Sequence, residues 1–107
     1  MSKARDEVLA ERQRQMDQEG YDRTHDAEHD PEELIRAALV YTLTSLAHPD
    51  ANGHVSVGME CRGVKLNWME SATALWPWDG GPKPKTQRRD LVRAAALLIA
   101  ALDRLED

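Results

Sequence analysis

Apolar side chains recur every three or four residues in three separate segments of the chain, the spacing that lines one face of an α-helix. The first helix is expected over about residues 3–19. Its inner face is only half apolar, because Arg12 and Gln15 stand at the same spacing as the apolar residues. Polar groups that are buried need partners. Both side chains are therefore expected to point toward the rest of the protein.

The second helix is expected from Pro31 to about Ala47. Asp30 can cap it, Pro31 suits the first helical position, and Glu33 completes a capping box. Its inner face is expected to consist of Leu34, Ala37, Ala38, Tyr41, Ser45 and Leu46. Further apolar residues widen this face, which indicates a central helix.

The last helix is expected from Thr86 or Gln87 to about Leu105. Its apolar stripe consists of Leu91, Ala95, Leu98, Leu102 and Leu105. Alanines on the same helix are small enough to allow close approach to the helix that begins at Pro31.

Between the second and last helices the apolar period changes to two, as in a β-strand. The phase of this alternation slips by one residue across Arg62-Gly63. A hairpin with a two-residue turn requires such a slip, and it pairs residue 57 with 68, 59 with 66 and 61 with 64. Cys61 falls on the apolar face and is expected to be buried as a small hydrophobic residue. The predicted fold is mainly α, a single domain over residues 1–107. It has three principal helices, the second and third antiparallel, and an inserted β-hairpin at about 55–68.

Composition narrows the classes of function. The chain has 107 residues and a net charge of −5, which argues against general nucleic-acid binding. Its single cysteine excludes an intrachain disulfide. The first residues are highly charged, unlike a signal peptide, and the longest apolar run is too short to span a bilayer. We expect a cytoplasmic protein with no membrane partner.

Charge is unevenly distributed along the chain. Residues 1–33 carry eleven Asp or Glu against five Lys or Arg, whereas residues 82–93 carry five Lys or Arg against one Asp. An anion site near the second segment is therefore compatible with an acidic protein.

A metal site is one interpretation of the acidic connector before the second helix. His25 and His29 lie four residues apart with Asp26 beside them, so a divalent cation could find ligands there. The alternative is an acidic connector that caps the next helix. No other cofactor is predicted.

A ligand site is suggested by the loop before the last helix. Trp76 and Trp78 offer stacking faces for a base. The basic residues that follow surround a helix N-terminus, which suits phosphate. The predicted ligand-binding residues are Arg12, Gln15, Trp76, Trp78, Lys83, Lys85, Arg88 and Arg89. In the alternative interpretation the tryptophans fill the core, and the basic residues pair with carboxylates such as those of the Asp26–Asp30 loop.

Several motifs occur together in the order Glu11-Arg12-Gln13-Arg14-Gln15, Glu19-Gly20-Tyr21, His25-Asp26 with His29, Trp76-Pro77-Trp78-Asp79, Lys83-Pro84-Lys85 and Arg88-Arg89-Asp90-Leu91-Val92. This combination resembles a widespread family of small phage and prophage proteins that has no assigned activity. The resemblance covers both ends of the chain, and residues 49–74 only poorly. It implies a phage accessory protein, for which antagonism of host defence is a reasonable role.

The sequence suggests three alternative functions. The first is binding of a phosphorylated, nucleotide-like ligand without turnover. The second is a metal-dependent nucleotide phosphohydrolase, in which Glu11 and Asp90 would join the residues of the metal site; the paired Glu-x-x-Glu motif of all-α pyrophosphohydrolases is absent. The third is inhibition of a host protein through the hairpin and the acidic surface. Apolar surface in excess of what three helices can cover predicts a homodimer.

Overall fold

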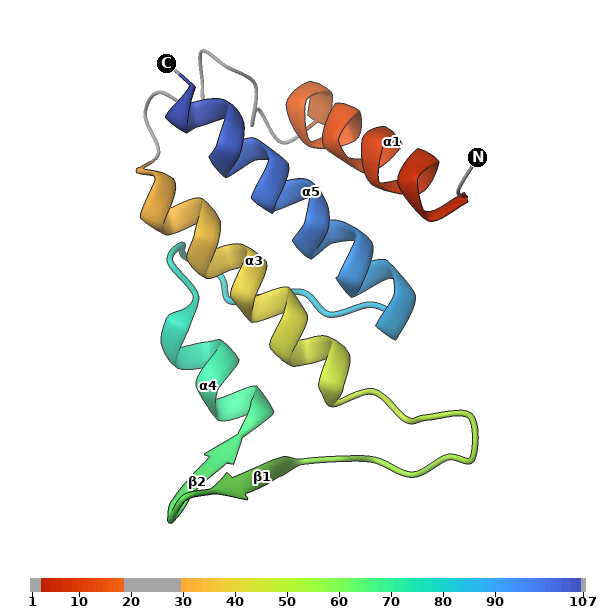
Figure 1. The fold of residues 1–107 in the computed structure, drawn as a ribbon, viewed down its shortest axis with the longest axis vertical. Coiled ribbons are helices and arrows are strands. Elements are labelled where there is room, and N and C mark those ends of the chain that lie inside the picture. The colour runs from red at the N-terminus through yellow and green to blue at the C-terminus, as the bar shows by residue number, and fades with distance from the viewer. Residues whose placement is uncertain (1–2, 19–29, 107) are drawn as a thin grey trace.

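The computed structural model describes residues 3–18 and 30–106. The elements in chain order are α1 (Lys3–Gln18), α3 (Pro31–Leu46), β1 (Gly58–Cys61), β2 (Val64–Asn67), α4 (Trp68–Leu75) and α5 (Gln87–Leu105). As Figure 1 shows, α3 and α5 lie side by side and antiparallel, with α1 against α5 and α4 against α3. The predicted mainly α fold with an inserted hairpin is confirmed.

Three helices begin at a polar side chain that accepts a hydrogen bond from a backbone N–H of the first turn. Asp30 Oδ1 accepts from Glu32 N at 2.8 Å. Thr86 Oγ1 accepts from Arg89 N at 3.0 Å, and Asn67 Oδ1 accepts from Glu70 N at 2.9 Å. These caps satisfy donors that have no partner within their own helix, so they fix where α3, α4 and α5 begin.

The core lies between α3 and α5 and is built largely from alanine. Its members are Leu34, Ala37, Ala38, Tyr41, Ala94, Leu97, Ala100 and Ala101. With few large side chains between them, the two helices approach closely, as the alanines of the last segment predicted. The chain has no phenylalanine, and the aromatic residues at this core are Tyr41, with Trp76 and Trp78 packed against it.

The leucine stripe of α5 does not face the core. Leu91, Leu98, Leu102 and Leu105 are all exposed, whereas Asp90, Ala94 and Ala101 are buried. Leu46, expected on the inner face of α3, is 44% exposed as well. The prediction that the leucine stripe of α5 faces the core is therefore wrong, because α3 packs against the small residues of α5 instead.

The hairpin forms in the predicted register. Met59 pairs with Leu66 and Cys61 with Val64, and Trp68 N donates to Val57 O at 3.0 Å. Arg62 and Gly63 occupy the turn with φ values of 51° and 82°. Positive φ at both residues is the geometry that matches the twist of the strands.

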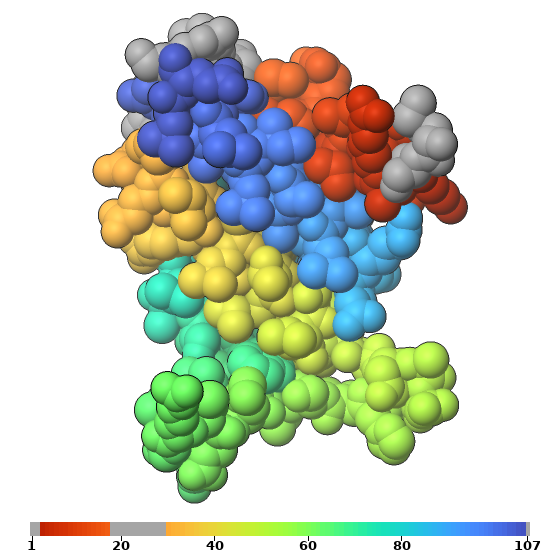
Figure 2. Space-filling view, in the orientation of Figure 1, coloured from red at the N-terminus to blue at the C-terminus, as the bar shows by residue number. Residues whose placement is uncertain are grey.

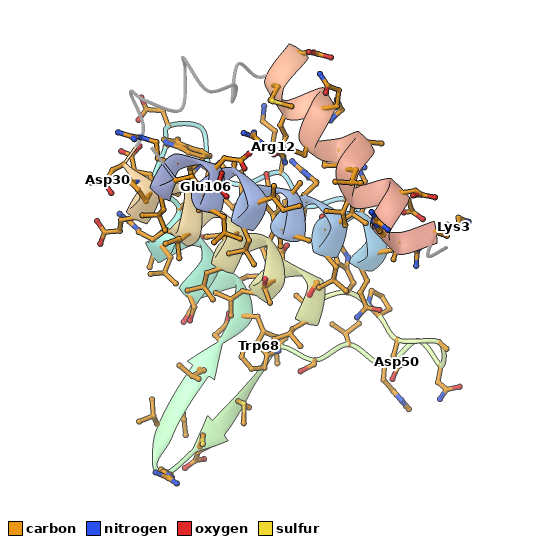
Figure 3. All side chains as sticks on the ribbon, turned by 45° about the horizontal axis from the view of Figure 1, so that its top comes forward. Lys3, Arg12, Asp30, Asp50, Trp68 and Glu106 are labelled. Carbon is orange, nitrogen blue, oxygen red and sulfur yellow. The ribbon has the colours of Figure 1, made fainter. Side chains whose placement is uncertain are left out.

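The hairpin projects from the helical body as an arm (Figures 1 and 2). Trp68 packs at its base, where its indole N–H donates to Ser56 Oγ at 3.0 Å (Figure 3). Beyond this residue the apolar side chains of both strands are exposed. Cys61 is exposed too, so its predicted burial is wrong: none of the described helices covers this face of the hairpin.

None of the described helices combines the length and the apolar composition that crossing a bilayer requires.

Candidate functional site

A buried carboxylate lies where α1 meets α5. Arg14 donates to Glu11 twice, from Nε to Oε1 at 2.8 Å and from Nη2 to Oε2 at 2.7 Å. Gln15 Nε2 donates to Glu11 Oε2 at 3.1 Å, and Arg89 Nη2 of α5 also donates to Glu11. These four residues, Glu11, Arg14, Gln15 and Arg89, are called the Glu11 cluster.

The Glu11 cluster combines one carboxylate with two guanidinium groups. The Glu11 side chain is fully buried, whereas Arg14 and Arg89 retain 30% and 40% of their side-chain exposure. Burial by itself raises the pKa of Glu11. The hydrogen bond from Arg14, the charges of Arg14 and Arg89 and the hydrogen bond from Gln15 outweigh it, so that the pKa of Glu11 is lowered. The Glu11 carboxylate is therefore charged at pH 7, beside two guanidinium groups.

The lowered pKa of Glu11 predicts a specific acid sensitivity. A carboxyl group whose pKa is lower in the folded protein stabilises it above the unfolded value of 4.5, and this stability is lost as the pH falls through the folded value. Glu11→Gln should therefore be less stable than wild type at pH 7. The difference between the two should shrink as the pH falls below about 4.5.

Urea unfolding of both proteins from pH 7 to pH 3 measures this difference, because other carboxyl groups contribute equally to the two. A difference that stays constant over that range would show that the Glu11 charge does not stabilise the fold.

Further ion pairs continue along the contact of α1 and α5. Arg88 donates to Glu7 at 2.7 Å, which lowers the pKa of Glu7. Arg12, which extends from α1 toward α5 (Figure 3), lies with Nη2 3.4 Å from Asp103 Oδ2. A cavity of about 380 Å³ opens in the same contact and is lined by Ala4, Val8, Gln87, Arg88, Leu91 and Val92. Charged groups therefore make up much of the contact between α1 and α5.

A second buried carboxylate, Asp90, joins α5 to α3. It accepts from Thr44 Oγ1 at 2.8 Å and from Lys85 N at 2.9 Å, and His48 Nε2 lies 2.7 Å from its Oδ2. Arg93 Nη1 is 3.8 Å away. The Asp90 carboxylate, in the first turn of α5, thus holds both the end of α3 and the loop before α5 in place.

Trp76 and Trp78 pack against the core from the loop after α4. Their rings meet edge to face at 5.3 Å between centroids, and Trp76 meets Tyr41 in the same way at 5.6 Å. The guanidinium of Arg93 lies 4.0 Å from the centroid of Tyr41. Both tryptophans are partly exposed, so they contribute to the core and still reach the surface.

The structure brings together some of the predicted ligand-binding residues. Gln15 and Arg89 belong to the Glu11 cluster, and Arg12 and Arg88 lie along the same helix contact. Arg88 and Arg89 have protein carboxylates opposite them, Glu7 and Glu11 of α1. Residues 26–29 of the other predicted partner, the Asp26–Asp30 loop, lie outside the described residues. The side chains of Lys83 and Lys85 are exposed. Their backbone groups bind Arg93 and Asp90.

The predicted metal ligands His25, Asp26 and His29 lie outside the described residues. Within residues 3–18 and 30–106, no group of three or more His, Cys, Asp or Glu is arranged to hold a metal ion. Glu11 and Asp90, the two other carboxylates of the phosphohydrolase hypothesis, belong to separate networks with their own protein donors.

Sequence reasoning missed Glu7, Thr44, His48 and Arg93. Glu7 could have been found, since it lies four residues before Glu11 on the same face of a helix. Thr44 and His48 gave no local signal, because their contacts with Asp90 join residues more than forty positions apart.

Comparisons of the chain with models of protein families, with curated proteins and with solved structures gave no match.

Proposed function

We propose that this chain binds a small phosphorylated, nucleotide-like ligand without turnover, beside the Glu11 cluster. The observation that supports this proposal is the excess of guanidinium groups around one buried carboxylate, in a protein whose net charge is −5. Buried charges at positions set by specific partners are enriched at functional sites. Arg14 and Arg89 both remain partly exposed, so a phosphate could contact their outer N–H groups while Glu11 holds the inner ones.

Two buried polar atoms add to this argument. Gln15 Oε1 and Trp76 Nε1 have no hydrogen-bond partner within the described residues. A buried polar atom without a partner is costly, and a ligand can supply what is missing. Gln15 would accept from a ligand N–H or hydroxyl group, and Trp76 would donate to a ligand acceptor.

The resemblance to phage and prophage proteins agrees with this function. Its motifs around Glu11 and around Arg89 come from opposite ends of the chain, and the two residues are in direct contact. Capture of a nucleotide-derived signal would suit an antagonist of host defence.

Calorimetry and thermal unfolding test the ligand proposal. Wild-type protein is titrated with phosphate, pyrophosphate and a panel of nucleoside mono-, di- and triphosphates. At least one should raise the melting temperature, because a ligand of the native state stabilises it. Arg89→Ala should abolish that rise. The rise is measured from the melting temperature of the ligand-free variant, because loss of the pair with Glu11 lowers that temperature. Arg62→Ala, in the hairpin turn, is the matched control and should keep it.

Absence of heat and of a melting shift with every member of the panel would show that the ligand proposal is wrong. Release of phosphate or pyrophosphate with added magnesium or manganese would show turnover and favour the phosphohydrolase.

A second candidate is binding of a host protein through the hairpin arm. The observation that favours it is the arm's apolar surface: Val57, Met59, Val64 and Leu66 are between 41% and 71% exposed. Such patches usually mark interaction sites. Met59→Lys should abolish copurification of a host protein with the tagged chain, whereas Leu9→Lys, at a half-exposed leucine of α1, should retain it. Equal recovery of the host protein with wild type and with both variants would count against binding through the hairpin arm.

A further inference from the structure

The leucines exposed on α3 and α5 lie on one face of the helix pair. Tyr41 of α3 and Arg93 of α5 both point toward the loop after α4, since Tyr41 packs on Trp76 and Arg93 donates to Lys83 O. Two residues of an α-helix turn the chain by about 200°. Leu39 and Leu91, two residues before Tyr41 and Arg93, therefore point to the opposite side. That side of α3 and α5 faces the viewer in Figures 1 and 2, and α1 and α4 leave it uncovered.

This surface, called the α3–α5 face, carries two seams of coiled-coil spacing. The seam of α5 contains Leu91, Ala95, Leu98, Leu102 and Leu105, and that of α3 contains Ile35, Leu39, Thr42 and Leu46. Successive members are four and three residues apart in turn, the repeat that packs helices together with side chains interlocked. Neither seam contains a charged residue. The large side chains of the α3–α5 face are 44–65% exposed.

The chain exposes more surface than a compact monomer of its mass. A compact monomer of this mass exposes about 6,000 Å², whereas this chain exposes 6931 Å². Its radius of gyration is 14.6 Å, against about 13 Å for a compact domain of this length. The hairpin arm accounts for part of the excess. A stable interface removes about 800 Å² from each partner, and the seven large apolar residues of the α3–α5 face offer a continuous surface for it.

We infer that the α3–α5 face binds a second copy of this chain, forming an antiparallel four-helix bundle. The face consists of two antiparallel helices with matching seams. A second copy related by a two-fold axis presents the same two seams, so each seam meets one of the same spacing. A single partner helix in the groove between α3 and α5 would leave the outer sides of both seams in water. The inference is independent of the ligand site, which lies at the contact of α1 and α5.

Light scattering and native mass spectrometry at high micromolar concentration test this interface. Wild type should have twice the mass of the chain. Leu98→Lys and Leu39→Lys, at the middle of the two seams, should raise the dimer dissociation constant roughly a hundredfold or more, because each copy would bury an unpaired charge. Both residues are half exposed in the single chain, so these variants should fold, and far-ultraviolet circular dichroism verifies it. Leu39→Ser, which adds no charge, is the milder variant and should weaken the dimer less.

The matched control is Leu66→Lys, the same change at a similarly exposed leucine of the hairpin arm. It should leave the dimer intact. Wild type with the mass of one chain at every concentration would overturn the inference. A dimer that neither Leu98→Lys nor Leu39→Lys weakens would also overturn it. A dimer that only Leu66→Lys dissociates would place the interface on the hairpin arm instead.

Discussion

Replacement of Asp90 by alanine should lower the free energy of unfolding by about 3–5 kcal/mol, the usual cost of removing one partner from a buried ionic network. Asp90 is fully buried and accepts hydrogen bonds from Thr44 Oγ1 and from Lys85 N. His48 Nε2 also lies within hydrogen-bond distance. Without the carboxylate these groups lose their common partner, and the hydrogen bond from Gln87 Nε2 to Ser45 O still joins α3 to the start of α5.

Guanidinium chloride unfolding measures this loss. The matched control is Asp103→Ala, because Asp103 pairs with Arg12 at 3.4 Å but keeps 43% of its side-chain exposure. An exposed pair of this kind contributes about 1 kcal/mol or less. Equal losses in the two variants would show that the hydrogen bonds of Asp90 do not govern stability.

Replacement of Leu34 by alanine should lower the free energy of unfolding by about 2–5 kcal/mol, through lost burial and the cavity left behind. Leu34 is fully buried, and it is one of only two leucines in the core between α3 and α5. The alanines around it are too small to fill the space by changing rotamer, so the cavity should persist. Leu34 also lies away from the proposed dimer face, so its effect should not depend on protein concentration.

The control for this variant is Leu9→Ala, because Leu9 is half exposed on α1. That change should alter stability by no more than about 0.5 kcal/mol. If both leucine variants were equally stable, the core described between α3 and α5 would be wrong.

Local signals account for the parts of the fold that could be predicted. Asp30 before Pro31, and the slipped alternation across Arg62-Gly63, are decided by residues within a few positions of each other. The sequence does not decide the structure of residues 67–75, which include α4, because two signals overlap there. Asn67 ends the alternation of β2 and also caps α4 by accepting from Glu70 N.

The buried face of α5 could not be predicted from its hydrophobicity. The periodicity selected the leucines, which are the most apolar residues of the helix, but α3 packs against the face that contains alanine and Asp90. That face is favoured by close approach of the backbones and by the Asp90 hydrogen bonds, neither of which appears in a hydrophobic pattern. The exposed leucines are then the residues that need a partner from outside the single chain.

The sequence predicted two residues of the Glu11 cluster as ligand-binding residues, but it did not predict the contacts that they make. Gln15 and Arg89 were both selected from the sequence, and burial of Arg12 and Gln15 was expected and is confirmed. The partner of Arg89 was not predicted, because Glu11 lies 78 positions away and its own neighbours along α1 gave no sign of the pairing.

The contact of α1 with α5 has a consequence for how the chain folds during synthesis. Between the two helices the described part of the chain holds the hairpin arm, α3 and α4, and Arg12 lies 91 positions from Asp103. At the usual rates of translation, roughly 3 to 14 s pass between completion of α1 and the start of α5. Throughout that interval α1 has none of its α5 partners. A strongly apolar helix would be prone to aggregate in that time, whereas α1 presents charged and amide groups that water can solvate. The ionic character of its contact face thus lets α1 stay in water until α5 has been made.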